Sequence, residues 1–407
     1  MAGEWRDCEW GDIAELAYGK ALRGYQDAEG DYRVYGTNGP IGWHEEPLCT
    51  HPGVIVGRKG AYRGIHYCTE PFYVIDTAFY LEPKEDMDQR WAYYCLLTYD
   101  INSMDSGSAI PSTSRDAFYH LPVSVPPLDE QQAIACILGA LDDKIELNRR
   151  MNQTLEGMAQ AIFKSWFVDF DPVRAKAEGR QPPGLKPEIA ALFPDSFDDS
   201  ELGQVPKGWR VGTLADIAVL NPESWNKNTR PPVINYVDLS NTKWGRIENI
   251  ATYEQNDAPS RAQRVLRPKD TIVGTVRPGN GSYSLINEEG LTGSTGFAVL
   301  RPQEPEYEEL IYLAATAPPN IERLSNLADG AAYPAVRPNI VADTYVVLPG
   351  SELVNTFSTI VGLLLNKIAQ NEKESRTLSG LRDTLLPKLV SGDLPVPDAE
   401  RIVGRCV

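Results

Sequence analysis

The stretch that decides the fold runs from Leu128 to Phe170 and reads LDEQQAIACILGALDDKIELNRRMNQTLEGMAQAIFKSWFVDF. Within it, apolar residues recur in alternating steps of four and three, which is the heptad pattern of a helix that buries one seam. The seam consists of Ile134, Leu138, Leu141, Ile145, Asn148, Asn152, Leu155, Ala159, Ile162 and Trp166. No proline interrupts it, so it predicts one helix of roughly 35 to 40 residues, about 50 to 60 Å long. A helix of this length needs a partner for its seam.

A weaker copy of the same pattern lies near the C-terminus. A constant register places Leu141, Ile145, Asn148, Leu155, Ile162 and Trp166 on Leu364, Ile368, Asn371, Leu378, Leu385 and Leu389. The register continues upstream, where Gly107-Ser-Ala-Ile-Pro111 falls on Gly330-Ala-Ala-Tyr-Pro334. So many matches in one frame indicate an internal duplication. We therefore predict two mixed units, each ending in a long helix, and an antiparallel pairing of the two helices.

The seam of this helix pair contains a polar residue in each copy. Asn148 and Asn371 lie near the middle of their helices, so an antiparallel pair would bring them close together. Such residues cost stability and often fix the register by pairing with a polar partner; the alternative is a solvated seam position. The predicted interface comprises Leu141, Ile145, Asn148, Leu155, Leu364, Ile368, Asn371 and Leu378.

Composition and charge narrow the class of protein. The chain has 407 residues, 42% of them hydrophobic, and no apolar run approaches the ~18 residues that span a bilayer. Six cysteines form no CxxC motif, which is typical of a reducing compartment, so we expect a cytoplasmic protein without a membrane partner. The formal net charge of -17 predicts weak DNA binding by the isolated chain, because affinity for DNA comes from cations that neutralise phosphates.

The first 127 residues alternate short β-rich runs with Gly/Pro turns. Strands are expected at 54–56, 72–75, 78–81 and 123–125, and a helix at 89–98. Between them lie amide-rich or basic loops at 35–42 and 57–64, whose glycines let backbone approach a ligand and whose cations suit phosphate. The second unit repeats the flanking strands, since Ile55-Val-Gly57 recurs as Ile272-Val-Gly274, but its loops differ. A similar frame with divergent loops favours two recognition modules with different targets.

Three motifs surround the first long helix: Pro126-Pro-Leu-Asp-Glu-Gln-Gln132, Ile137-Leu-Gly-Ala-Leu-Asp-Asp-Lys-Ile-Glu-Leu-Asn148 and Phe163-Lys-Ser-Trp-Phe-Val-Asp-Phe-Asp-Pro172. Together they resemble the first conserved region of the specificity subunits of type I restriction-modification systems. Upstream, Tyr35-Gly-Thr-Asn-Gly39, Gly57-Arg-Lys-Gly60, Asp76-Thr-Ala-Phe79 and Ser108-Ala-Ile-Pro111 are similar to the target recognition domains of that family. The second helix departs from the pattern, with Gly350-Ser-Glu-Leu-Val-Asn355 where Pro-Leu-x-Glu-Gln is expected.

This resemblance implies an α+β fold in which two pseudo-symmetric target recognition domains are separated by two long antiparallel coiled-coil helices. It implies that each domain reads one half of a bipartite asymmetric sequence in double-stranded DNA. It also implies two methyltransferase subunits as partners and, through them, restriction subunits. The expected divisions are recognition domain 1 at 1–127, the first long helix at 128–170, an acidic Pro-rich linker at 171–206, recognition domain 2 at 207–350, the second long helix at 351–391 and a tail at 392–407.

Loop residues are the expected DNA contacts, because Arg and Lys pair with guanine or phosphate and Asn pairs with adenine. In the first domain these are Asn38, Arg58, Lys59 and Arg63. In the second they are Lys227, Arg230, Asn241, Lys243 and Arg277.

Catalytic motifs were sought in the same sequence. It has neither a GxxxxGK[ST] phosphate loop nor an Asn/Asp-Pro-Pro-Tyr/Phe methyltransferase motif, so we expect a non-catalytic chain without a cofactor. Asp142-Asp-Lys144 resembles part of a nuclease motif. It lies on the heptad helix, however, where a solvent-exposed helix face accounts better for three charged residues in a row. Zinc could bind the two Cys and two His of Cys49-Thr-His51 and His66-Tyr-Cys68, but the usual spacing is absent, so we expect no metal. The competing hypotheses are a fused restriction-methyltransferase enzyme and a coiled-coil adaptor that does not read DNA.

Overall fold

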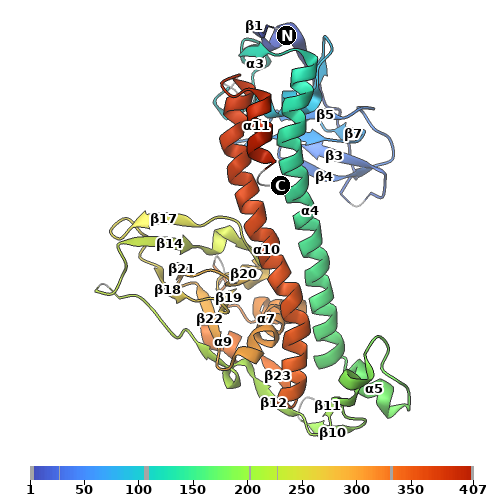
Figure 1. The fold of residues 1–407 in the computed structure, drawn as a ribbon, viewed down its shortest axis with the longest axis vertical. Helices are drawn as coiled ribbons and strands as arrows, with labels where there is room; N and C mark the ends of the chain where they lie inside the picture. Colours follow the sequence, from blue (N-terminus) through green and yellow to red (C-terminus); the bar gives the residue numbers. More distant parts are fainter. Residues whose placement is uncertain are drawn as a thin grey trace. The chain divides into compact units, whose positions relative to one another are not determined.

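The computed structural model describes residues 4–26, 28–104, 110–200, 203–226, 228–330 and 333–404 (Figure 1). The chain forms two compact units: Met1–Arg149 with Glu372–Val407, and Arg150–Asn371. Both divisions fall inside long helices, α4 (Leu128–Phe167) and α10 (Ser351–Val390), each of 40 residues. Each unit therefore contains a part of both helices together with sheets of its own, which confirms the predicted mixed fold with a long helix pair.

In the first unit, the N-terminal half of α4 packs against the C-terminal half of α10. One buried cluster joins residues of both halves: Ile134, Leu138, Leu141, Leu378, Leu385 and Leu389, with Ile145 at its edge. An ion pair between Asp142 and Arg382, with a shortest separation of 2.7 Å, links the helices, and the Tyr94 hydroxyl also donates to Asp142 at 2.6 Å. The start of one helix thus meets the end of the other, so the pair is antiparallel.

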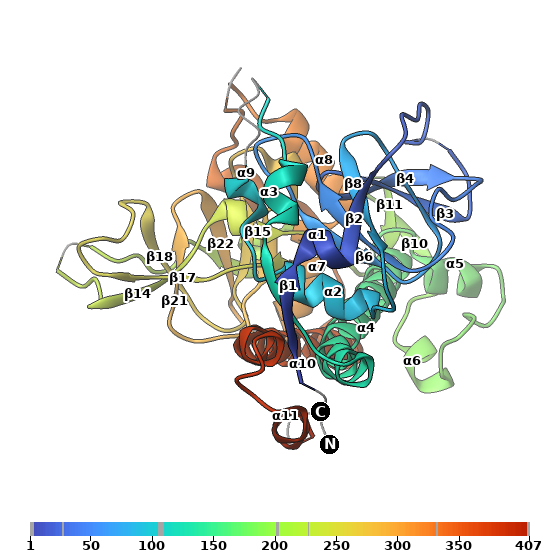
Figure 2. The ribbon, with the colours of Figure 1, turned by 90° about the horizontal axis from the view of Figure 1, so that it is seen from above.

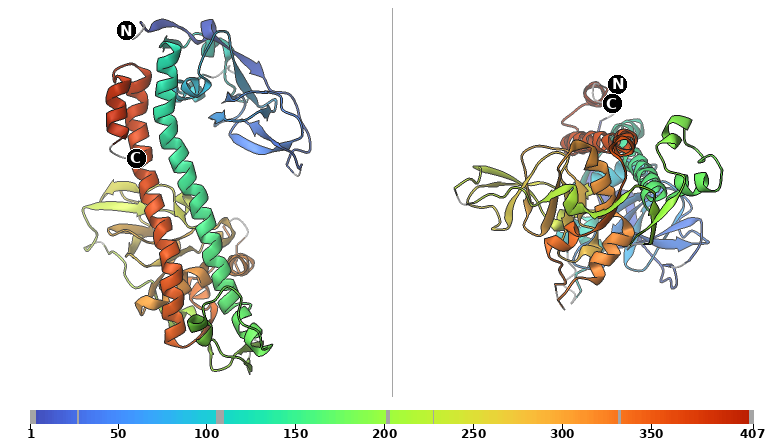
Figure 3. Two further views of the ribbon diagram at one scale, coloured as in Figure 1. Left: turned by 45° about the vertical axis from the view of Figure 1, so that its right-hand side comes forward. Right: turned by 90° about the horizontal axis from the view of Figure 1, so that it is seen from below.

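In the second unit, the opposite halves meet in the same way. The C-terminal half of α4 and the N-terminal half of α10 share a cluster that includes Ala159, Phe163, Trp166, Phe357, Val361 and Leu365, with Leu364 and Ile368 packed against it. Figure 3 shows the two helices side by side. Leu155, also predicted at the interface, is half-buried.

The two seam asparagines are both 1% exposed and both bond to the opposing helix. Asn148 donates to Oε2 of Glu374 at 2.7 Å and to Oγ of Ser375 at 3.3 Å. Asn371 donates to Oδ1 of Asn152 at 2.8 Å. Residues 152 and 375 correspond in the repeat, so both units bury the same asparagine and satisfy it at the same place. Direct pairing of the two asparagines with each other stays a prediction.

Within the residues that the structure describes, the first unit contains three sheets. Their strand orders are β2-β8-β5-β6, β4-β3-β7 and β1-β9. The strands are β1 (Arg6–Glu9), β2 (Ala14–Tyr18), β3 (Tyr32–Gly36), β4 (Gly39–His44), β5 (Gly53–Gly57), β6 (Ile65–Cys68), β7 (Phe72–Val74), β8 (Ala78–Pro83) and β9 (Pro122–Val125).

The second unit repeats this topology. Sheet β13-β22-β19-β20 matches β2-β8-β5-β6, β17-β14-β21-β18 extends the pattern of β4-β3-β7, and β12-β23 matches β1-β9. The strands are β12 (Arg210–Thr213), β13 (Ala218–Leu220), β14 (Val233–Val237), β17 (Ala251–Glu254), β18 (Ala262–Leu266), β19 (Thr271–Gly274), β20 (Tyr283–Leu285), β21 (Leu291–Ser294), β22 (Phe297–Pro302) and β23 (Tyr345–Leu348). The parallel pair β3·β7 recurs as β14·β21, so the duplication read from sequence is also a duplication of topology.

Each unit also contains short helices, and Figure 2 looks along the two long helices from above. The first unit has α1 (Trp10–Ile13), α2 (Gln89–Leu96), η1 (Ile101–Ser103), α3 (Arg115–Tyr119) and α11 (Val396–Val403). The second has η2 (Leu214–Asp216), η3 (Leu239–Asn241), η4 (Pro278–Asn280), η5 (Pro305–Tyr307), α7 (Glu308–Thr316), α8 (Pro318–Asn326) and α9 (Pro338–Ala342). None of the helices in the described ranges is both long and apolar enough to cross a membrane.

The segment between α4 and the second set of sheets has structure of its own. It contains α5 (Asp171–Ala177), α6 (Pro187–Ala191) and the hairpin β10 (Phe197–Ser200)–β11 (Gly203–Pro206). An aromatic contact binds it to the end of α4, because Phe193 packs edge-on against Trp166 at 5.0 Å, and Phe193 shares a buried cluster with Phe357 of α10. Apolar burial thus fixes this acidic, proline-rich segment to the second unit.

The helix pair generates a stability prediction for both units. Ile145→Asp and Ile368→Asp place a carboxylate in the apolar seam, where burial without a partner is costly, and each should lower the free energy of unfolding by about 2–4 kcal/mol. Matched controls on the same helices are Leu147→Asp and Leu363→Asp, whose side chains are 52% and 69% exposed. Denaturant unfolding of the full chain measures both pairs. Equal effects of the seam and the control substitutions would contradict the packing described for the helices.

Candidate nucleic-acid interface

The predicted basic loop of the first unit is the turn between β5 and β6. Gly57 N–H donates to Gly64 O at 2.7 Å and closes the turn. The loop that follows η1 docks onto it, because Gly60 N–H donates to Pro111 O and Thr113 N–H donates to Arg58 O, both at 2.9 Å. Backbone bonds therefore hold two loops, distant in sequence, as one surface.

The second unit builds the same arrangement between β19 and β20. Gly274 N–H closes this turn on Ser282 O at 2.7 Å, and Arg277 N–H donates to Pro334 O at 2.7 Å. Val336 N–H donates to Thr275 O at 2.9 Å. Each of these three bonds has a counterpart in the first unit, and the second turn is one residue longer, because Gly57 to Gly64 corresponds to Gly274 to Ser282. We call the two surfaces loop cluster 1 (residues 57–64 and 110–113) and loop cluster 2 (residues 274–282 and 333–336).

The corresponding positions Gly60 and Arg277 share a left-handed backbone, with φ of +118° and +47°. Glycine adopts this conformation at little cost, whereas a long side chain there is uncommon and strained. The second unit therefore keeps the turn geometry while replacing a residue without a side chain by an exposed guanidinium. The backbone of Arg277 is set by the fold of the turn and not by its own preference.

The four predicted residues of the first unit all lie in or beside loop cluster 1. Asn38 is exposed, and its amide is oriented to donate to Tyr62 O at 2.7 Å. Arg58 is half-buried, donates to Asp76 O at 2.9 Å and stacks over the Tyr18 ring at 4.8 Å. Lys59 lies on the rim of the cluster, with Nζ 3.6 Å from an Asp76 carboxylate oxygen.

Arg63 differs from the other three because its side chain faces inward. It is only 4% exposed, and its guanidinium donates to Asn102 O at 2.7 Å, Ile101 O at 3.2 Å and Gly60 O at 3.4 Å. A cation that satisfies three carbonyl groups inside the protein supports the turn. The basic character of the loop did not reveal this role, because sequence does not show which arginine of a turn points inward.

The predicted residues of the second unit fall into two groups. Asn241, Lys243 and Arg277 lie on adjoining loops, since Ser282 Oγ of loop cluster 2 donates to Leu239 O at 3.0 Å. The short strands β15 (Thr242–Lys243) and β16 (Arg246–Ile247) continue from η3, and Lys243 Nζ lies 3.7 Å from Glu248. Arg230 lies on another loop and donates to Pro259 O and Ala262 O at 2.7 and 2.8 Å. Lys227 lies outside the described residues.

Exposed apolar side chains on the same loops were missed by the sequence analysis. Tyr62 and Ile110 in loop cluster 1 are 81% and 63% exposed. Tyr333 in loop cluster 2 is 73% exposed and stacks under the Arg277 guanidinium at 5.1 Å, and Trp244 beside it is 55% exposed. Ile110 and Tyr333 occupy the same repeat position. Large apolar residues within glycine-rich turns were the signal that could have identified them.

Metal and cofactor chemistry gains little support from the described residues. Among them, no group of three or more His, Cys, Asp and Glu side chains is placed to hold a metal ion. Cys49 is buried with Sγ 3.6 Å from the His51 ring nitrogens, and burial raises the pKa of its thiol. Burial likewise lowers the pKa of His66. The acidic pair on α4 is used structurally: Asp143 binds Arg90 at 2.6 Å, and Asp142 binds Arg382.

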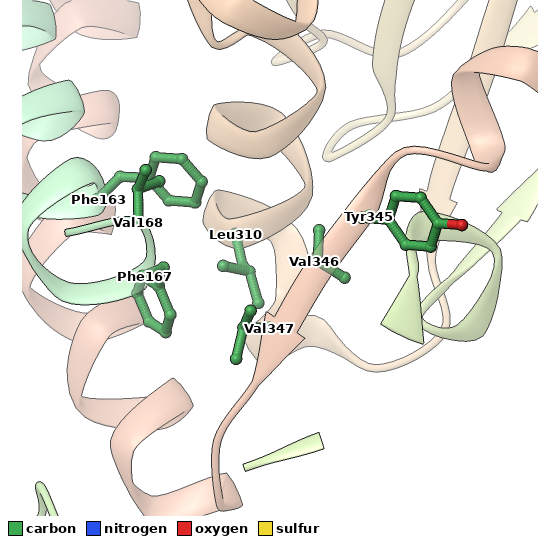
Figure 4. Close-up of a pocket in the computed structure, with 7 residues that line it drawn as sticks. All are labelled: Phe163, Phe167, Val168, Leu310, Tyr345, Val346 and Val347. Atoms are coloured by element: carbon green, nitrogen blue, oxygen red, sulfur yellow. The ribbon is translucent and has the colours of Figure 1, made fainter. Parts of the chain in front are cut away.

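One pocket in the second unit differs in kind from the loop clusters. It lies between the end of α4, α7 and β23 and is lined by Phe163, Phe167, Val168, Leu310, Tyr345, Val346 and Val347 (Figure 4). Its lining contains no charged side chain, so it lacks the groups that recognise phosphate.

Comparisons with known proteins agree with the duplicated fold. Residues 2–157 match the model of the type I restriction modification DNA specificity domain. The chain is similar to the type I restriction enzyme HindI specificity subunit of Haemophilus influenzae, with 27% identity over 381 residues that cover 79% of this chain and 81% of the relative. It is also similar to the MjaIX specificity subunit of Methanocaldococcus jannaschii, with 23% identity over 336 residues covering 78% and 71% of the two chains.

Among solved structures, the crystal structure of a type I restriction-modification S subunit from M. genitalium has the same fold. It superposes with a TM-score of 0.61 at 18% identity, over 95% of this chain and 96% of that chain. The topology is duplicated, residues 2–157 match the specificity domain, and the chain is similar over most of its length to type I restriction enzyme specificity subunits.

Proposed function

We propose that this chain is the sequence-reading subunit of a type I restriction-modification complex, in which each unit reads one half of a bipartite, asymmetric site in double-stranded DNA. The observation that carries the proposal is the pair of loop clusters. The same backbone bonds build both, yet their exposed side chains differ: Tyr62 and Ile110 in one, Arg277 and Tyr333 in the other. A common frame that presents different side chains suits the recognition of two different half-sites.

In this proposal the helix pair sets the distance between the half-sites and docks two methyltransferase subunits, through which restriction subunits join. Large apolar side chains on the outer faces of the helices support docking, because Leu147, Met158 and Leu363 are 48% to 69% exposed. Such residues are costly to leave in water along a helix and are typical of interaction surfaces. The proposal assigns methyl transfer and ATP-driven cleavage to the partner subunits and none of this chemistry to this chain.

The net charge of -17 fits a subunit that binds DNA as part of a complex. Two cations of the candidate interface have acidic neighbours: Asp76 lies beside Lys59 and Glu248 beside Lys243. These pairs are exposed and therefore weak, so phosphates can displace the carboxylates. A coiled-coil adaptor without a DNA role would need neither cluster, and no feature of the loops favours that function.

The proposal is tested by expressing the chain with the methyltransferase subunit encoded beside it, in a host free of DNA methylation, and mapping methylated adenines across the genome. The expected result is methylation at a single gapped motif with two unequal halves. A soluble, co-purified complex that methylates no site would contradict the reading role and favour an adaptor. The methyltransferase subunit expressed alone is the control.

The turn of loop cluster 2 allows a clean test of one DNA contact. Arg277→Gly removes the cation and places at φ +47° the residue type that the first unit has at Gly60, so the turn should persist. Loss of a base or phosphate contact should weaken binding of the assembled complex to its site by about tenfold, equivalent to about 1.4 kcal/mol. Titrations at several salt concentrations measure this effect, and loss of a phosphate contact should also reduce the salt dependence.

Two further variants show whether the effect belongs to the loop cluster. Arg58→Ala should weaken target binding and leave complex assembly intact. Arg180→Gly removes an exposed cation that pairs with Glu178 in the segment after α4, and it should change neither. Unchanged affinity of the Arg58 and Arg277 variants, or equal loss in the Arg180 variant, would refute the assignment of DNA contacts to the clusters.

A further inference from the structure

Trp244 is a large apolar side chain held at the edge of loop cluster 2 with much of its indole in solvent. The residue is 55% exposed. The backbone N–H of Trp244 donates to Gly281 O at 2.6 Å, and the backbone N–H of the following Gly245 donates to Tyr283 O at 3.0 Å. The segment is therefore tied to the turn by backbone bonds on both sides of the tryptophan.

The backbone at Trp244 is left-handed, with φ of +48°. A bulky residue in this conformation is a genuine outlier, and such residues concentrate where a surface binds a ligand. Arg277, at φ +47°, lies on the turn to which Trp244 is bonded. Loop cluster 2 and the segment bonded to it thus each carry one exposed non-glycine residue in the same strained conformation.

The indole offers only one face to a partner. A Cβ placed on Gly281 would lie 2.6–2.7 Å from Cδ2, Cε2 and Cε3 of Trp244. Points equidistant from three contiguous atoms of a six-membered ring lie on the axis through its centre, so the Gly281 backbone sits over the ring and not beside its edge. The Tyr283 ring packs edge-on against the indole, with 6.0 Å between the ring centroids and an angle of 86° between the ring planes. The covered face and the edge-on tyrosine fix the ring, and because the residue is still 55% exposed, we infer that its other face is the exposed one.

This geometry limits what the ring can do on duplex DNA. A wedge between base pairs needs two open faces, and here the glycine backbone occupies one. Bases in an intact duplex present only their edges to a protein, and the apolar group on those edges is the 5-methyl of thymine in the major groove. A rigid ring with one covered face, held on the turn that also carries Arg277, suits contact with that methyl group.

We propose that Trp244 is a specificity-determining residue that contacts the 5-methyl group of one thymine in the half-site read by the second unit. The inference rests on the proposed function, since it requires duplex DNA at loop cluster 2. The contact would add apolar readout to the polar readout that Arg277 provides.

The test uses the complex of the full chain with its methyltransferase subunit. The DNA is a duplex that contains the sequence motif at which this complex methylates adenine. Each thymine of the motif is replaced in turn by deoxyuridine, which lacks only the 5-methyl group, and affinity is measured. The affinity of the wild-type complex should fall by about 3- to 10-fold when one particular thymine is replaced, which is the effect expected for one buried methyl group. Trp244→Gly, which suits φ +48° and removes the indole, should bind the thymine duplex less tightly and lose that sensitivity.

Two variants make the result specific. Trp244→Phe keeps an aromatic face and should retain part of the sensitivity. Trp43→Ala removes another partly exposed indole, which Arg33 covers at 4.3 Å in the first unit, and should behave as wild type.

The outcomes separate this inference from the proposed function. Failure of the wild-type complex to methylate any motif removes the reading role and the inference with it. A gapped motif at which no thymine shows deoxyuridine sensitivity, or at which Trp244→Gly keeps the wild-type sensitivity, overturns the inference alone.

Discussion

The burial of one apolar seam along two antiparallel helices is the constraint on which the rest of this structure depends. Each helix of 40 residues is too long for one small domain to cover, so each contributes one half to either unit. Each unit buries one seam asparagine, Asn148 in the first and its repeat counterpart Asn371 in the second. Each is hydrogen-bonded to the opposing helix. Sliding one helix along the other would leave these amides without their partners, and this penalty fixes the register.

The duplication extends from the helices to the loops, but its preservation is uneven. Gly139 in α4 lets the Arg90 guanidinium approach, and the corresponding Gly362 in α10 lets the Glu309 carboxylate approach, so the close contact persists while its charge reverses. The turns after β5 and β19 behave alike. Their backbone bonds agree, whereas the residue at the left-handed position changes from Gly60 to Arg277. Backbone geometry constrains the frame of the loop clusters, and their exposed side chains are free to diverge.

Sequence patterns predicted the parts of the fold that rest on periodicity. The heptads gave both long helices, and the β-rich runs gave the strands at β5, β7, β8 and β9. Helix α11 was not predicted, because eight residues carry little periodic signal. Its buried Ala399 packs into the hydrophobic cluster of the first unit. For the candidate site, composition pointed to loops that form the two clusters but did not show the orientation of single side chains. Arg63 and Arg58 lie five residues apart in one turn. Arg63 nevertheless points inward, because its guanidinium donates to the carbonyl groups of Ile101 and Asn102, which are distant in sequence. Exposed Trp244 escaped notice because its position depends on a turn some 37 residues later in the sequence.

The central claim is that the two units read separate halves of one DNA site. The most direct measurement compares the methylated motifs of complexes that carry Arg58→Ala in the first unit or Arg277→Gly in the second. The account predicts that each variant relaxes base preference in one half only, that the two variants affect opposite halves, and that the spacer length stays unchanged. Relaxation of the same half by both variants, or of both halves by either variant, would contradict it.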